Sequence, residues 1–358
     1  MSLDVLFRPY RLGPVALANR IVMAPMTRRR ADADNVPSPL AATYYAQRAS
    51  AGLVISEACV VSAGGAGVPG SPGLYDAAQE RAWAAIVQAV HDAGGRIVAQ
   101  LWHAGRFSAP AFLGGAVPVA PSAIAIDGEL TTSAGGRPFV TPRALRLDEL
   151  PAVVESFADA ARRAARAGFD GVEIHAAQGY LLDQFLRDGS NRRDDAYGGA
   201  AAGRARLLCE VVDAVAATVG AGLVGVQLSP RSALGDMRDS DPVGTFTEVA
   251  AQLDRRGLAY LHVFEPVEPG EADARVSPHL RRVFRGPVIA NGGYDARTAA
   301  EAIGAGEADL VSFGRAFIAN PDLVERLRRG VPLAAADPAT FYGGGAAGYT
   351  DYPTGPSS

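Results

Sequence analysis

Lysine is absent from this sequence: all 34 of its Lys and Arg residues are arginines. Schiff-base aldolases, enzymes that anchor pyridoxal phosphate, and P-loop nucleotide-binding proteins all depend on a lysine amine. The sequence therefore excludes these three classes of protein.

Cysteine is also scarce, and neither sign of charge dominates the sequence. The two cysteines, Cys59 and Cys209, lie far apart and form no CxxC or metal-ligand spacing, which fits a reducing compartment. The formal net charge is -4, and no basic stretch alternates with aromatic residues. We therefore expect no nucleic-acid partner. The short basic run Arg28–Arg30 is interpreted as a solvated loop.

Long apolar runs are missing as well. No segment approaches the ~18 apolar residues of a membrane span, and the N-terminus carries Asp4 without a signal-peptide core. We expect a cytoplasmic protein without membrane contact. The chain has 358 residues, 48% of them hydrophobic and 20% charged, which is sufficient for a large buried core.

Eight short β-branched segments recur, and alanine-rich segments of helical period lie between them. The expected strands are 20–25, 53–60, 96–103, 171–177, 223–230, 260–266, 287–293 and 309–315. Segments 77–94 and 148–168 have helical patterns that close with glycine. This alternation favours a (β/α)8 TIM barrel, an α/β fold, over an open doubly wound sheet, which would need GxGxxG after its first strand.

A minimal barrel needs roughly 250 residues, so about a hundred are additions. They fall in residues 1–19, in 104–147 after the third strand, and in a Gly-, Pro- and Tyr-rich tail at 330–358. Because the loops that follow barrel strands form the catalytic face, we expect 104–147 to be a rim or lid and the tail to lie over the mouth. The whole chain, 1–358, is expected to form one domain.

The C-terminal ends of the strands carry amides, hydroxyls and imidazoles. In a barrel these ends meet at one mouth, where polar side chains indicate chemistry rather than packing. The residues expected there are Thr27, Gln100, His103, His175, Gln178, Tyr180 and Gln227. They include neither paired carboxylates nor a set of metal ligands, so two-carboxylate hydrolysis and a zinc site are poorly supported.

Glycine clusters end the seventh and eighth strands. Asn291–Gly293 has the sequence NGG, and Phe313–Arg315 has the sequence FGR. Glycine lets backbone N–H groups approach an anion closely, and Arg315 adds a permanent positive charge. One such cluster is usually an ordinary turn, but two on neighbouring strand ends with an arginine favour a phosphate site.

These segments resemble the old yellow enzyme family of FMN-dependent ene-reductases. The similarity extends through APMTR, AQLWHAGR, AGFDGVEIHAAQGYLLDQFL, NRRDDAYGG, LSP, NGG, FGRAFIANPDL and GYTDYP. Threonine after APM points to the family's Thr-bearing branch. The resemblance implies the same barrel, bound FMN, no metal, and NADPH or NADH as the hydride donor.

The resemblance also implies a set of flavin contacts. Thr27 is expected to hydrogen-bond the flavin C4 carbonyl, and Gln100 to meet the pyrimidine edge. The other expected contacts are Pro25, Met26 and Ala58 along the ring, and Gly293, Gly314 and Arg315 at the phosphate.

In the same family pattern, His175 and the residue three further on, here Gln178, bind the carbonyl oxygen of an α,β-unsaturated substrate. This makes the β-carbon electrophilic toward hydride from flavin N5. Tyr180 would then protonate the α-carbon from the opposite side, as a phenol that is neutral at pH 7. Tyr349 in GYTDYP matches a family position near the substrate, although a packed aromatic of the tail is an equal alternative.

Two residues depart from the family pattern. Gln178 replaces the family's His or Asn and is one methylene longer than Asn. Gln227 replaces an arginine beside flavin N1 and the C2 carbonyl, and a neutral amide cannot balance the charge of reduced flavin. Arg231, four residues later, is expected in a solvated loop rather than at N1.

The leading hypothesis is an NAD(P)H-dependent reductase of the activated C=C bond in small enone-type carbonyl or nitro compounds. One alternative is an FMN enzyme of the same fold that catalyses a redox-neutral isomerisation or a substrate oxidation. The other is a barrel that serves as a non-catalytic binding scaffold. The physiological substrate, the choice of NADPH or NADH and the oligomeric state stay open.

Overall fold

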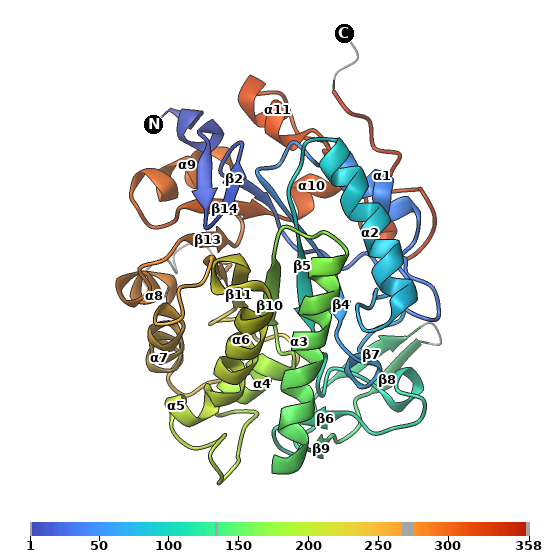
Figure 1. Cartoon of the computed structure of the whole chain (residues 1–358), viewed down its shortest axis with the longest axis vertical. Helices are drawn as coiled ribbons and strands as arrows, with labels where there is room; N and C mark the ends of the chain where they lie inside the picture. Colours follow the sequence, from blue (N-terminus) through green and yellow to red (C-terminus); the bar gives the residue numbers. More distant parts are fainter. Residues whose placement is uncertain (1, 133–134, 267–274, 356–358) are drawn as a thin grey trace.

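Eight parallel strands close into a barrel in the computed structural model, which describes residues 2–132, 135–266 and 275–355 (Figure 1). Neighbours in the barrel are also neighbours in the chain, and pairing of the last strand with the first closes the ring. The barrel strands are β3 (Ile21–Met23), β4 (Leu53–Val60), β5 (Ile97–Trp102), β10 (Val172–Ala176), β11 (Val224–Leu228), β12 (Tyr260–Phe264), β13 (Val288–Asn291) and β14 (Leu310–Phe313). The predicted (β/α)8 TIM barrel and its eight strand segments are confirmed.

The strands form because their β-branched residues are buried on both faces, inside the barrel and beneath the helices. All eight residues of β4 and all five of β11 are buried. In β4 the pairing register shifts between Ile55 and Ala58. This bulge brings the Glu57 carboxylate to the backbone N–H of Arg28, which it accepts at 3.0 Å.

Helices surround the barrel (Figure 1). Both predicted helices are present: the first is α2, which begins at a capping box made by Asp76 and Gln79, and the second is α3. The helices are α1 (Leu40–Ala46), α2 (Ala77–Asp92), α3 (Leu150–Arg166), α4 (Leu181–Leu186), α5 (Ala201–Arg204), α6 (Arg206–Val219), α7 (Pro242–Asp254), α8 (Ser277–Val283), α9 (Ala296–Gly304), α10 (Arg315–Ala319) and α11 (Leu323–Arg329).

Additions cover the two ends of the barrel. The hairpin of β1 (Tyr10–Leu12) and β2 (Val15–Leu17) packs Leu12 and Leu17 against apolar residues from the start of the barrel strands. The insertion after β5 holds β6 (Val119–Ala120), which pairs with β9 (Arg143–Ala144), and the hairpin of β7 (Glu129–Thr132) and β8 (Gly135–Pro138). Residues 133–134, inside the insertion, lie outside the described residues.

The arginine run Arg28–Arg30 is not a solvated loop, and this prediction was wrong. Arg28 and Arg30 are 1% and 8% exposed. Their guanidinium groups donate to backbone carbonyls of the tail between residues 340 and 348. Arg28 bonds the oxygens of Phe341 and Gly348 at 2.9 and 2.8 Å. Arg30 bonds those of residues 340, 345 and 347 at 3.1–3.2 Å. We call this arrangement the tail clamp.

Candidate active site

A cavity of about 620 Å³ lies at the C-terminal ends of the barrel strands, a size typical of small-molecule sites. It gathers residues from the loops after β3, β10 and β14 with inward-facing residues of β4, β5 and β11. Of the residues predicted from the sequence, it is lined by Pro25, Met26, Thr27, Ala58, Gln100, His175, Gln178, Tyr180, Gln227, Gly314 and Arg315.

Three predicted residues do not line this cavity. Gly293 is exposed at the end of β13, with a φ of 88°. His103 is 5% exposed; burial lowers its pKa to about 4, and its Nδ1 accepts the Gly105 N–H at 3.1 Å. Tyr349 is fully buried, stacks on Tyr44 with 4.1 Å between ring centroids, and so is a packed aromatic of the tail.

Tail aromatics nevertheless reach the cavity at other positions. Phe341 and Tyr342 both line it, and the Tyr342 side chain is 60% exposed. Tyr342 could not be predicted from the sequence because it lies in a glycine-rich stretch whose path over the mouth is set by the tail clamp. From the rim, Phe107 at the start of the insertion also lines the cavity.

His175 and Tyr180 face one another across the cavity wall, with ring centroids 5.0 Å apart and planes at 83°. Burial, with a smaller effect of His262, lowers the pKa of His175 to about 3, so its imidazole is neutral at pH 7. Its Nδ1 is buried and has no hydrogen-bond partner among the described residues. Burial, and then Tyr342, raises the pKa of Tyr180 to about 12. The pair thus offers a neutral imidazole and a neutral phenol.

A tight turn after β10 places these side chains. Gln178 and Gly179 both have left-handed backbone conformations, with φ of 54° and 76°. A Cβ on Gly179 would lie 2.4 Å from the Leu234 carbonyl oxygen, so only glycine fits there. The Gln178 N–H donates to the Ser229 hydroxyl at 2.6 Å, which ties the turn to the loop after β11.

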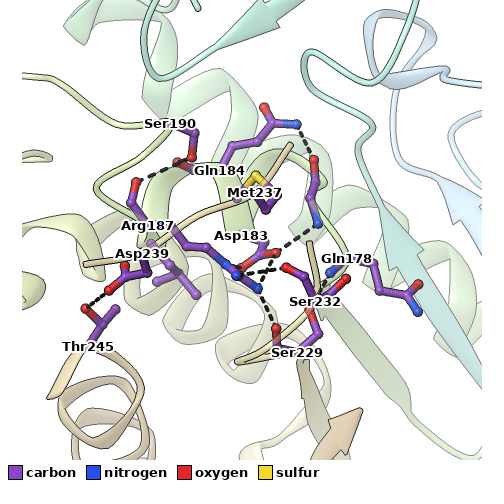
Figure 2. A network of polar contacts seen from close by, with 12 residues as sticks. Gln178, Asp183, Gln184, Arg187, Ser190, Ser229, Ser232, Met237, Asp239 and Thr245 are labelled. Atoms are coloured by element: carbon purple, nitrogen blue, oxygen red, sulfur yellow. Dashed lines mark hydrogen bonds and ion pairs between the residues drawn. The ribbon is translucent and has the colours of Figure 1, made fainter. Parts of the chain in front are cut away.

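A buried ion pair, Asp183 and Arg187, lies beside the same turn (Figure 2). Asp183, on α4, accepts the Gly179 N–H at 2.8 Å and pairs with Arg187 Nε at 2.8 Å. Both side chains are nearly inaccessible, at 0% and 2% exposure. Arg187 also donates to the backbone oxygens of Ser229 and Ser232, the latter at 3.0 Å. The pair therefore joins the turn, α4 and the loop after β11.

Two amides form the floor of the cavity, and their hydrogen bonds fix what each presents to a ligand. Gln100 Nε2 donates to Glu173 Oε1 at 2.9 Å and to Gln227 Oε1 at 3.0 Å. Because a carboxylate only accepts, Gln100 must direct its NH2 group toward Glu173, and Gln227 must direct its oxygen toward Gln100. Gln100 Oε1 remains, and Gln227 Nε2, which lies 3.4 Å from His262 Nδ1, keeps a second hydrogen for a ligand. The floor offers an acceptor beside a donor.

The charges around the cavity are of one sign. Among the residues that the structure describes, its lining includes Arg28, Arg29 and Arg315 and no acidic side chain. Arg315 is exposed, and Arg29 is held by a hydrogen bond from its Nε to the Pro69 oxygen at 3.0 Å. Arg231 does not line the cavity. The mouth therefore favours an anionic ligand group.

Several residues that shape the site were missed in the sequence, chiefly Glu173, His262, Asp183 and Arg187. A signal existed for the first two, because each interrupts an otherwise apolar strand. Glu173 and His175 are two positions apart on β10, so they share the inner face of the barrel.

Among the described residues, no cluster of three or more His, Cys, Asp or Glu side chains could hold a metal ion, and no helix is long and apolar enough to cross a membrane.

Several known proteins are similar to this chain in sequence and in fold. A sequence model of the NADH:flavin oxidoreductase / NADH oxidase family matches residues 5–334. The old yellow enzyme homologue from Zymomonas mobilis superposes with a TM-score of 0.95 at 47% identity, over 97% of this chain and 99% of that one. Morphinone reductase in complex with tetrahydroNAD has a TM-score of 0.93 at 48% identity, over 98% of each chain. The 12-oxophytodienoate reductase 1 of Oryza sativa subsp. japonica is 44% identical over 356 residues, which is 97% of this chain and 92% of that protein.

Proposed function

Because the chain belongs to the NADH:flavin oxidoreductase / NADH oxidase family and is an oxidoreductase of the old yellow enzyme type, we propose that it reduces the activated C=C bond of α,β-unsaturated carbonyl or nitro compounds, with NADH or NADPH as the electron source. The observation that carries this proposal is the neutral His175–Tyr180 pair beside a floor that offers an acceptor and a donor. Relatives named as reductases of morphinone and of 12-oxophytodienoate support the substrate class.

The cavity residues suit FMN, the cofactor of this family. The acceptor of Gln100 beside the donor of Gln227 matches an N–H next to a carbonyl, which is the pattern of the flavin pyrimidine edge. Thr27 would hold the C4 carbonyl, and Arg315, with Gly293 and Gly314, would hold the phosphate. Pro25, Met26 and Ala58 would line the ring. When bound, FMN supplies the hydride-transfer chemistry.

His175 and Gln178 would orient the substrate and polarise its carbonyl group. The free Nδ1 of His175 leaves this imidazole with hydrogen-bonding capacity for a ligand. Gln178 lines the cavity from a turn whose backbone is fixed by Ser229 and Asp183, so its amide can donate to the same oxygen. Donors fixed in this way stabilise negative charge that develops on oxygen during the reaction.

Tyr180 would deliver the proton to the substrate α-carbon. The raised pKa, about 12, keeps the phenol protonated through neutral pH. Such a weak acid gives up its proton only to a strongly basic centre, so it does not lose it to solvent before the carbanion-like centre develops. Trp102 and Phe107 hold its ring edge-on, with centroids at 5.0 and 5.5 Å.

The visible spectrum of the purified protein tests the cofactor, and two anaerobic additions test the reaction. We expect about one FMN per chain, bleaching by NADH or NADPH, and return of the yellow colour on addition of 2-cyclohexenone. A colourless protein that gains no FMN would overturn the proposal and favour the scaffold alternative. A protein bleached by nicotinamide and reoxidised by oxygen but not by the enone would overturn the substrate class and favour isomerisation or oxidation.

A further inference from the structure

A glutamate and a histidine form a buried pair inside the barrel, just behind the two amides of the cavity floor. Glu173 on β10 and His262 on β12 are both fully buried, and the Oε2 of the former lies 2.9 Å from the Nδ1 of the latter. Strand β11 runs between them and contributes Gln227, which is in register with His175 on one side and His262 on the other. Neither member of the pair lines the cavity.

His262 is the group that can balance the charge of Glu173. Among the described residues, the Glu173 carboxylate bonds Gln100 and His262 and also interacts with the Tyr260 phenol, and no arginine contacts it. Tyr260, on the same strand as His262, stays neutral because burial, and then Glu173, raises the pKa of its phenol far above its usual value. His175 is neutral as well, since burial lowers its pKa. A buried carboxylate without a cation is costly, and His262 is the described residue placed to supply one.

The far side of His262 can accommodate either protonation state. Its Nε2 lies 2.8 Å from the Ser312 hydroxyl, which also accepts from Asn291 Nδ2 at 2.6 Å. The Ser312 proton has two acceptors: His262 Nε2, or the Ala290 carbonyl at 3.4 Å. If Ser312 donates to Nε2, His262 is neutral, with its one proton on Nδ1 toward Glu173. If Ser312 donates to Ala290, His262 can carry a second proton on Nε2 and donate it to Ser312. Rotation of one hydroxyl therefore changes the state and leaves no donor unpaired.

We propose that Glu173 and His262 form a proton store for the cavity: His262 binds its second proton more tightly when negative charge appears on a ligand beside Gln227, and releases it when that charge leaves. The proposal rests on the proposed function, since reduced FMN is that ligand. The proton comes from solvent, and Asn291, which lines the cavity, bonds the Ser312 hydroxyl that His262 also contacts. A titratable charge one strand away would thus take the place of the fixed arginine charge that the resemblance implies at position 227.

Nitrogen-15 NMR of the histidine side chains measures the protonation of His262 directly. The chain has five histidines, so the His262 signal is assigned as the one lost in His262→Gln, with His279→Gln as the matched control on the outer helix α8. We expect the pH at which His262 gains its second proton to rise by at least one unit, a tenfold change in proton affinity, when bound FMN is reduced anaerobically. An unchanged His262 titration would overturn the proposal.

A fixed charge at position 227 provides a second, opposite test. In Gln227→Arg the guanidinium supplies the balancing charge, so the His262 titration should no longer shift on reduction. Gln227→Met, of similar length but without charge, should keep the shift. A shift retained in Gln227→Arg, or lost equally in both variants, would contradict the proton store.

The proton count on reduction covers the case in which a buried variant folds poorly. Measured with a pH indicator, wild type should take up more protons per flavin on reduction than His262→Gln, by up to about half a proton for a tenfold change in proton affinity. Equal uptake would overturn the inference. If the protein is yellow and reduces enones but the protonation of His262 does not change on flavin reduction, the proton store alone is wrong. A protein that binds no FMN would remove the proposed function and the store together.

Discussion

Tyr180 is the single residue whose role can be separated most cleanly from its neighbours. Tyr180→Phe keeps the ring packing against Trp102 and Phe107 but removes the proton, because those contacts are edge-on ring contacts. We expect flavin reduction by nicotinamide to stay within a few-fold of wild type and reoxidation by an enone to slow by about 10²–10⁴-fold. Stopped-flow absorbance of the two half-reactions, each measured anaerobically, gives both rates.

Tyr342→Phe is the matched control for that change. It removes a hydroxyl from the other tyrosine of the cavity, which is exposed and outside the barrel. Its enone step should remain within about threefold of wild type, since a single surface hydroxyl contributes little. Similar losses in both half-reactions of Tyr180→Phe would mean a disturbed fold, and similar losses in both variants would place the proton donor elsewhere.

Among the elements, the turn between β10 and α4 depends most on one contact. Asp183→Asn keeps an acceptor for the Gly179 N–H but leaves the buried Arg187 guanidinium without its carboxylate. An uncompensated buried charge costs about 3–5 kcal/mol, and we expect the free energy of unfolding to fall by that amount. Urea titration followed by circular dichroism measures it.

Asp159→Asn provides the comparison for this ion pair. Asp159 pairs with Arg163 at the same i,i+4 spacing on α3, but its side chain is 39% exposed. Such a surface pair contributes about 0.3–0.5 kcal/mol. If the two variants lost the same small free energy, the ion pair below the turn would not be what stabilises it.

The elements that could be predicted are those whose signal is local. Each barrel strand is a short β-branched run buried on two faces, and α2 carries its own capping box, so neither needs distant information. The catalytic-face residues could be predicted because all strand ends of a barrel meet at one mouth. Arg28 could not, because its acceptor at Gly348 is a backbone oxygen 320 residues further along the chain.

Tyr349 was expected near the substrate from its motif, but the structure places it in the packed tail. Its motif matched the family, but a motif does not show which side of the chain faces the cavity, and its ring stacks on Tyr44 instead. Likewise, Glu173 is one letter in an otherwise apolar strand, and its partners Gln100 and His262 are 73 and 89 residues away. Which residues contact Glu173 therefore becomes known only once the strands are closed into the barrel.

At the scale of the whole molecule, the tail clamp joins the C-terminal segment to the loop after the first barrel strand. Arg30→Ala removes hydrogen bonds to residues 340, 345 and 347. Each charge-assisted bond contributes about 1.5–3 kcal/mol, so we expect amide hydrogens of residues 340–350 to exchange at least about tenfold faster. Hydrogen exchange with mass spectrometry, with peptides of α3 as the internal reference, measures this.

Arg206→Ala is the control for the clamp, because Arg206 is exposed and bonds a single carbonyl, that of Ala196, at 2.8 Å. Exchange in the tail should be unchanged in this variant. Faster exchange over the whole chain in Arg30→Ala would show that the clamp stabilises the barrel rather than the tail alone.

The clamp holds carbonyl oxygens, which every amino acid supplies. Anchoring of residues 340–348 is therefore independent of the side chains in that segment, whereas Phe341 and Tyr342 in the same segment form part of the cavity wall. Attachment of the tail and the lining of the cavity are thus carried by different atoms of one stretch of chain. Saturation libraries at positions 341 and 342 can consequently reshape the cavity while the tail stays in place, which makes this segment a favourable starting point for directed evolution of the substrate range.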